Sequence, residues 1–139
     1  MEKMTANETV LTQKQMEVLK LRKEGHSQEE IAQKFGKTKQ NISAIERMAR
    51  RKVKRAENTV KFTKLLEAPI WFAVDKNTNI DDVAERVFSE ADRAKIHMVY
   101  DSLSLAMKIR ENAGNKIKHR VILREFEIGV TKEGEILIV

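Results

Sequence analysis

Apolar residues recur every three to four positions along the first third of the chain, which is the spacing of amphipathic helices. Residues 11–25 have a threonine cap, end on a glycine and carry an apolar set of Leu11, Val18, Leu19 and Leu21. The next segment, residues 27–36, also ends on a glycine. It opens with Ser27 three positions before Glu30, which is a capping-box pattern. The pattern predicts two short helices separated by a tight turn.

A third helix is predicted to begin at Lys39, directly after Thr38, whose hydroxyl is a good N-cap acceptor. The residues of its apolar stripe are Ile42, Ile45, Ala49 and Val53. The residues that face the opposite way are Gln40, Ala44, Arg47 and Arg51. This outer face is cationic and can form hydrogen bonds, so it suits a polyanion better than a core or a membrane. The three segments fit the helix-turn-helix pattern, and a plain three-helix bundle is the alternative.

The third helix is predicted to continue well past residue 55, because no glycine follows before Pro69, the first helix breaker. It is expected to reach about Glu67, either as one helix or as two helices with a break near Asn58. The predicted organisation has three parts, which are a helix-turn-helix domain (1–56), a helical connector (57–68) and a second domain (69–139).

The second domain is predicted to be a small α/β domain, with a sheet of about four strands and helices on at least one face. The predicted elements are an apolar strand after Pro69, a helix capped by Asn79, a strand over residues 95–100, a helix capped by Asp101, and a C-terminal β-hairpin. The helix after Asp101 is expected to bury Leu103, Ala106 and Met107, and His97 is expected to be a core residue of its strand. The whole chain is therefore predicted to be mixed α+β or α/β.

Charge is distributed unevenly along the chain, whose net charge is +6. Residues 12–55 contain 13 Lys and Arg against 5 Asp and Glu, whereas residues 56–139 contain 13 against 14. The excess of positive charge therefore lies within the predicted helix-turn-helix, as expected for a surface that binds phosphates.

Sequence motifs of catalysis are absent. The chain has no cysteine, its three histidines lie in separate segments, and no phosphate-binding glycine loop or nucleophile motif occurs. Asp81 and Asp82 fall in the first turn of a predicted helix, where the helix dipole favours carboxylates. Ser102 and Ser104 could hold an anion at a helix start, although simple capping is the favoured interpretation. No enzyme, cofactor or metal site is therefore expected.

A family resemblance rests on two stretches of sequence. The first, LTxxQxEVLxLxxxGxSxxEIAxxFGxTxxxI over residues 11–42, resembles the DNA-binding domain shared by bacterial sigma-factor region 4 and LuxR-type response regulators. IxxIExxAxRKV over residues 42–53 is closer to the sigma factors. Over its full length, with its ending RVILREFEIGVTKEGEILIV, the chain resembles the archaeal Tfx family of DNA-binding transcriptional regulators.

The resemblance implies that the helix from Lys39 enters the major groove while the helix from Ser27 crosses the DNA backbone. The implied base-reading residues are Lys39, Gln40, Ser43, Ala44 and Arg47. The expected phosphate contacts are Ser27, Lys37, Thr38, Arg50, Arg51, Lys54 and Arg55. Sigma factors often have arginine or glutamate where this chain has Gln40 and Ala44, so a bacterial minus-35 element is not the expected target.

The predicted function is sequence-specific binding of double-stranded DNA in transcriptional regulation. The expected partners are DNA, a second copy of the chain and a candidate small-molecule or anion effector on the second domain, with no membrane contact. Two alternatives stay open, a non-specific nucleoid-type protein and the DNA-binding end of a recombinase-like enzyme. A polar N-terminus and the lack of a long apolar run lead us to expect a cytoplasmic protein.

Overall fold

The computed structural model describes residues 3–139, which form two compact units. The first unit ends at Asn58, and the second runs from Thr59 to Val139. Each unit has an apolar core of its own, formed by helices in the first unit and by helices and strands in the second. The chain is therefore mixed α+β, with an N-terminal helical region followed by a small domain that contains a sheet, as its sequence predicts.

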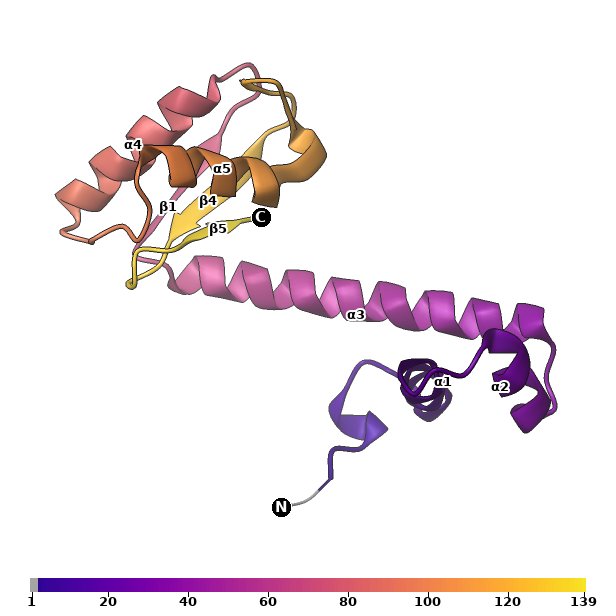
Figure 1. Ribbon diagram of the computed structural model, residues 1–139. Helices are drawn as coiled ribbons and strands as arrows, with labels where there is room; N and C mark the ends of the chain where they lie inside the picture. The colour runs from indigo at the N-terminus through magenta and orange to yellow at the C-terminus, as the bar shows by residue number, and fades with distance from the viewer. Residues whose placement is uncertain (1–2) are drawn as a thin grey trace. The chain divides into compact units, whose positions relative to one another are not determined.

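The first unit contains the predicted helix-turn-helix (Figure 1). Its elements are a short 3-10 helix η1 (Ala6–Glu8), α1 (Gln13–Lys23), α2 (Gln28–Phe35) and the first part of α3 (Lys39–Glu67). The predicted caps are confirmed. Thr12 and Gln15 form a reciprocal capping box at the start of α1, and Ser27 and Glu30 form another at the start of α2. Gly36 ends α2 with a φ of 64°, in the left-handed region that suits glycine.

A small apolar core holds these three helices together. Its fully buried members come from all three helices and are Val18, Ile31, Ala32 and Ile42. Ile42 and Ala49 are both 0% exposed, so the predicted apolar stripe of α3 faces inward. The opposite face of α3, with Gln40 and Arg47, is therefore held toward solvent.

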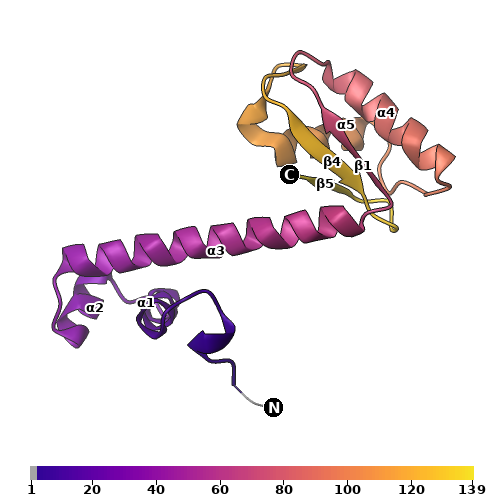
Figure 2. The same cartoon turned by 180° about the vertical axis from the view of Figure 1, so that it is seen from behind.

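The second unit is built on a three-stranded antiparallel sheet, as Figure 2 shows with the sheet in front. In spatial order the strands are β1 (Ile70–Val74), β4 (Phe126–Val130) and β5 (Ile136–Ile138). The central strand is β4, whose Val130 lies opposite Ile70 on one side and Ile136 on the other. Pairing of β4 with β5 confirms the predicted C-terminal hairpin.

Two helices, α4 (Ile80–Arg93) and α5 (Ser102–Ala113), cover one face of this sheet in both views (Figures 1 and 2). Asn79 caps α4 as predicted, because its side chain accepts a hydrogen bond from the amide of Asp81 at 2.8 Å. Helices and strands share one buried core, which includes Val83, Val87, Leu105, Ile109, Phe72 and Ile128.

No strand forms over residues 95–100, so this predicted strand is wrong. The strands of the second unit are instead divided between a three-stranded and a two-stranded sheet. Lys95 follows the C-cap of α4 with a φ of 61°, and the segment after it crosses the turn between β4 and β5. There the amide of Val99 donates to the carbonyl of Gly134 at 3.2 Å, which is a contact with a turn and not with a strand. His97 is exposed, so its predicted place in the core is wrong as well.

The buried face of α5 also differs from the predicted one. Leu103 and Met107 are 73% and 62% exposed, whereas Leu105 and Ile109 are both 0% exposed. Each pair is separated by four positions, so helical periodicity fits either face equally well. The sheet contacts the Leu105 face, and an apolar stripe formed by Leu103 and Met107 remains on the surface.

A second, two-stranded antiparallel pair completes the second unit. It consists of β2 (Ile117–Lys118) and β3 (Val121–Ile122). The connection between them is held to the start of α4, since Arg120 forms an ion pair with Asp81 and its carbonyl accepts from the amide of Ile80 at 2.8 Å. Asp81 thus has a structural partner, in agreement with the structural role predicted for it.

The last turns of α3 belong to the second unit. α3 is a single helix of 29 residues, so the uninterrupted alternative is the one observed. Leu65 is 1% exposed, and its Cδ1 lies 2.7 Å from the position that a Cβ would take at Gly129 in β4. A side chain at position 129 would displace Leu65, so the bare backbone there permits the helix to lie close to the sheet.

Gly134→Ala is expected to destabilise the second unit strongly. A Cβ at this position would lie 1.9 Å from the carbonyl oxygen of His97, and the backbone φ is 83°. We expect a loss of more than about 2 kcal/mol in the free energy of unfolding, because left-handed backbone alone costs about 1–2 kcal/mol for a residue with a side chain. Chemical denaturation followed by fluorescence of Trp71 measures this.

Gly114→Ala is the matched control. Gly114 has a φ of 56°, but a Cβ there would meet nothing within 4 Å. Both substitutions place a side chain at a positive φ, and only Gly134→Ala adds a clash with backbone atoms. Equal losses of stability in the two variants would contradict the close approach of residue 97 to the turn.

Candidate nucleic-acid interface

A short turn places α3 directly after α2. Gly36 ends α2, and the amide of Lys37 donates to the carbonyl of Ala32 at 2.9 Å. Thr38 then starts α3, its hydroxyl accepting a hydrogen bond from the amide of Asn41 at 3.1 Å. Both ends of the turn are therefore fixed by local hydrogen bonds, which sets the direction of α3 relative to α2.

The five predicted base-reading residues lie on the first two and a half turns of α3. Lys39, Gln40 and Arg47 are exposed, whereas Ser43 and Ala44 are half-buried. Exposed amide and guanidinium groups on one helix face can reach base edges, and the small residues between them leave room for close approach. The structure thus brings this set together on one surface of the first unit.

The predicted phosphate-binding residues fall into two groups. Five are exposed cations, namely Lys37, Arg50, Arg51, Lys54 and Arg55. The other two, Ser27 and Thr38, are N-caps whose hydroxyl oxygens already accept hydrogen bonds from backbone amides. Their O–H groups can still donate to a phosphate, because a hydroxyl both accepts and donates.

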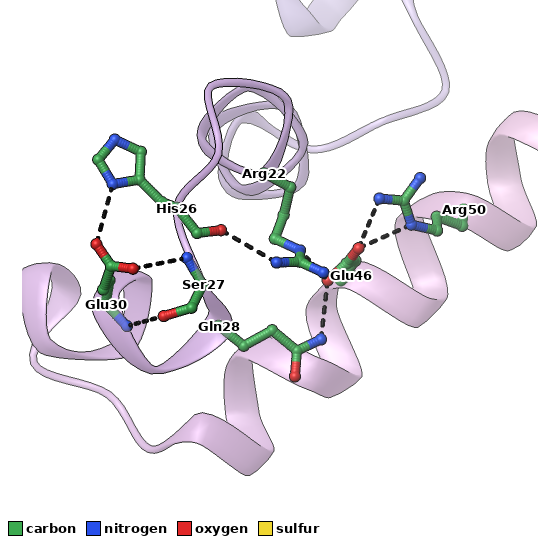
Figure 3. Close-up of polar contacts among 7 residues, drawn as sticks. All are labelled: Arg22, His26, Ser27, Gln28, Glu30, Glu46 and Arg50. Atoms are coloured by element: carbon green, nitrogen blue, oxygen red, sulfur yellow. Dashed lines mark hydrogen bonds and ion pairs between the residues drawn. The ribbon is translucent and has the colours of Figure 1, made fainter.

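Glu46 is a buried acidic residue at the centre of a polar cluster in the first unit (Figure 3). The sequence did not predict this role. Its carboxylate accepts hydrogen bonds from Arg22 Nε at 3.0 Å and from Gln28 Nε2 at 2.8 Å, both at Oε1. The other oxygen, Oε2, accepts from Arg50 Nε at 2.8 Å. Because Arg22 lies in α1 and Gln28 in α2, this carboxylate on α3 connects all three helices.

The environment of Glu46 keeps its carboxylate ionised. Burial acts to raise the pKa of Glu46, but the hydrogen bonds from one amide and two guanidinium groups outweigh it, and the pKa lies below its usual value. A charged residue that is only 6% exposed in a helical core is stable only when it is paired in this way. Arg22 is fixed further, since its Nη1 donates to the carbonyl of His26 at 3.1 Å.

The start of α2 is fixed by a second polar group. The side chain of Glu30 accepts from the amide of Ser27 at 3.1 Å, and His26 Nδ1 lies 3.6 Å from the same carboxylate (Figure 3). The hydrogen bonds from Ser27 lower the pKa of Glu30. This group orients the first turn of α2, the helix expected to cross the DNA backbone.

At the start of α5, two of the polar residues singled out in the sequence are partners of each other. Asp101 and Ser104 form a reciprocal capping box, in which each backbone amide donates to the other side chain at 2.9 and 2.8 Å. The hydrogen bonds from Ser104 lower the pKa of Asp101. Capping thus accounts for these groups. Over residues 3–139, no three His, Asp or Glu side chains gather where they could hold a metal ion.

Among the helices within residues 3–139, none combines the length and the apolar character that a membrane span requires. The longest, α3, carries lysine and arginine along its first half.

The first unit has the architecture of helix-turn-helix proteins, and comparison with protein families agrees. The model of sigma-70 region 4 matches residues 9–55, and the model of the C-terminal part of the DNA-binding protein TFX matches residues 56–138. The second match covers more than half of the chain. The chain therefore belongs to the Tfx family.

Individual relatives extend over nearly the whole chain. A protein named DNA-binding protein Tfx from Methanothermobacter marburgensis is 40% identical over 133 residues, which is 96% of each chain. Putative transcriptional regulatory proteins from Methanocaldococcus jannaschii and Thermococcus kodakarensis are 36% and 30% identical. These matches cover 93% and 92% of this chain, and 94% and 83% of the relatives.

Proposed function

We propose that this protein is a transcriptional regulator that binds double-stranded DNA by placing the first turns of α3 in the major groove. The observation that carries the proposal is the outer face of α3, on which exposed Gln40 and Arg47 stand beside a dense group of cations. The names of the relatives, a DNA-binding protein and regulators of transcription, support the same assignment.

Base reading is assigned to Lys39, Gln40, Ser43, Ala44 and Arg47. An amide such as that of Gln40 can bond adenine with two hydrogen bonds, and a guanidinium such as that of Arg47 can do the same with guanine. A straight helix leaves the groove further along α3 and meets the phosphates there. Phosphate binding is therefore assigned to the basic residues of that part, Arg50, Arg51, Lys54 and Arg55. Lys37 and Thr38 are assigned to contact the DNA backbone at the turn before α3, and Ser27 is assigned to contact it at the start of α2.

In this function the chain carries out no catalytic step. The protein lies in the cytoplasm, where the DNA of a cell without a nucleus is found. A small-molecule or anionic effector bound by the second unit remains part of the proposal. The hollow to test first in that unit is lined by Lys64, Thr131, Lys132, Glu133 and Glu135.

Gln40→Ala and Arg51→Ala are expected to have different effects on DNA binding. Loss of the Gln40 amide should relax the preference at one base pair, at a cost of roughly 1–3 kcal/mol for the preferred sequence. Loss of the Arg51 charge should weaken binding to every sequence. It should also make the dependence of log affinity on log salt concentration, the salt slope, shallower by about one unit. Titrations of a selected duplex and of a scrambled duplex at several salt concentrations separate the two effects.

Wild-type protein provides the reference in the same titrations. If the wild type binds selected and scrambled duplexes equally, the protein is a non-specific DNA binder. If Gln40→Ala lowers both affinities alike while Arg51→Ala changes sequence preference, α3 does not lie in the groove as proposed.

The proposal includes a homodimer formed through the second unit. A single helix-turn-helix reads few base pairs, and such proteins commonly bind two half-sites as symmetric dimers. On the second unit, Leu103 and Met107 of α5 form the exposed apolar stripe, and Val99 just before this helix is 58% exposed. Exposed apolar side chains at helical spacing are suited to pack against a second helix.

Leu103→Lys is expected to weaken self-association. A charge in the centre of a helix-helix contact should raise the dimer dissociation constant at least about tenfold. Sedimentation velocity over a range of concentrations measures it, and Asn112→Lys is the control because it adds the same charge at an exposed site on the same helix. A wild-type protein that stays monomeric both free and bound to DNA would rule out the dimer.

A further inference from the structure

A hollow of about 500 Å³ opens beside the buried carboxylate of the first unit. Its charged lining consists of five basic side chains and one acidic one, namely Arg22, Arg47, Arg50, Arg51, Lys54 and Glu46, and the polar residues Gln28 and Ser43 complete it. Such a concentration of cations around a concave surface attracts an anion. The acidic residue in its wall therefore needs an explanation.

Glu46 does not have the geometry of a base-reading residue. A glutamate can accept a hydrogen bond from cytosine in the major groove. Here, however, both carboxylate oxygens already accept hydrogen bonds from protein groups, and the side chain is 8% exposed. The carboxylate is therefore committed to the protein and not available to a base edge.

Glu46 instead orients two guanidinium groups. Arg50 contacts Oε2 through both Nε, at 2.8 Å, and Nη2, at 2.6 Å, so one edge of its planar guanidinium is fixed. The side chain of Arg50 nevertheless remains 61% exposed, which leaves the other edge accessible from the hollow. Arg22 is held on the same carboxylate and is 35% exposed. A pre-oriented guanidinium loses less conformational entropy when it binds an anion than a freely rotating one.

We propose that this hollow is the seat of a single DNA backbone phosphate and that Glu46 is the positioning residue that holds Arg50, and with it Arg22, ready to bind it. The inference rests on the proposed DNA binding and names a contact within it. Guanidinium groups are well matched to phosphate oxygens, to which they donate two parallel hydrogen bonds.

The inference makes an unusual electrostatic prediction. Removing a negative charge from a protein that binds DNA ordinarily strengthens binding, because it reduces repulsion of the phosphates. Glu46→Gln should instead weaken binding, because Arg50 loses the carboxylate that holds it. Glu57→Gln is the matched control, since Glu57 is exposed on the same helix outside the hollow and its loss removes the same charge.

Fluorescence anisotropy with a duplex selected by the wild-type protein measures the affinities of these variants. We expect Glu46→Gln to bind roughly three- to tenfold more weakly than wild type, which is less than the loss of a whole charge-assisted hydrogen bond, because the Arg50 guanidinium remains and only its orientation is lost. Glu57→Gln should bind as tightly as wild type or more tightly. Arg50→Gln should bind more weakly, and its salt slope should be shallower than that of the wild type by about 0.9 units, the amount for one phosphate contact.

A double-substitution cycle separates positioning of Arg50 from a general structural effect. If Glu46 acts through Arg50, then adding Glu46→Gln to Arg50→Gln should cause little further loss of affinity. An equal loss in both backgrounds overturns the inference, as does a gain of affinity in Glu46→Gln similar to that in Glu57→Gln. Circular dichroism identifies any variant that has not folded.

A phosphate scan decides the question even if Glu46→Gln does not fold. Duplexes that carry one uncharged methylphosphonate at each position in turn identify the phosphates that matter. At one position, the methylphosphonate should weaken binding of the wild-type protein but not of Arg50→Gln. The absence of such a position overturns the inference. Inorganic phosphate at millimolar concentration should not abolish binding; if it does, the hollow is a site for free phosphate.

Failure of the proposed function looks different. In that case the wild-type protein itself shows no salt-dependent binding to any duplex, and no comparison of variants is needed. Failure of this inference leaves wild-type binding intact and changes only the ranking of the Glu46, Glu57 and Arg50 variants.

Discussion

The first unit depends on one buried carboxylate. Glu46 accepts hydrogen bonds from Arg22 of α1, Gln28 of α2 and Arg50 of α3, so the direction of α3 is set by charge as well as by apolar packing. Within the described residues of this unit, the apolar core cluster consists of Val18, Ile31, Ala32 and Ile42, which is little surface to fix three helices. A paired charge with directional hydrogen bonds adds the geometric precision that a small apolar core lacks.

The second unit follows a different logic, in which a sheet and two helices bury one larger apolar core. Glycines permit two close approaches within this unit. Gly129 lets Leu65 of α3 approach β4, and Gly134 lets residue 97 cross the turn between β4 and β5. The apolar stripe of Leu103 and Met107 is left outside this core, and this is why the second unit is proposed to carry the contacts between copies.

The sequence predicted the parts of the structure that local chemistry determines. Thr12, Ser27 and Gly36 mark helix ends through hydrogen bonds to neighbouring residues, so these ends could be identified from the sequence. The role of Glu46 could not, because its partner Arg22 lies 24 positions away in the chain. Nor could periodicity decide which of two equivalent stripes of α5 is buried. Segment 95–100 has the composition of a strand, but strand formation requires a partner strand, and the sheet offers it none.

The most direct test of the central claim is nuclear magnetic resonance of the labelled protein during addition of a selected duplex. The account predicts that the largest shifts occur in backbone amides of residues 37–51 and in the Nε–H signals of Arg22 and Arg50. Signals of β4 in the second unit should change little. The account is contradicted if α3 amides between residues 39 and 47 stay unchanged while the duplex binds, because the groove-reading helix would then lie elsewhere.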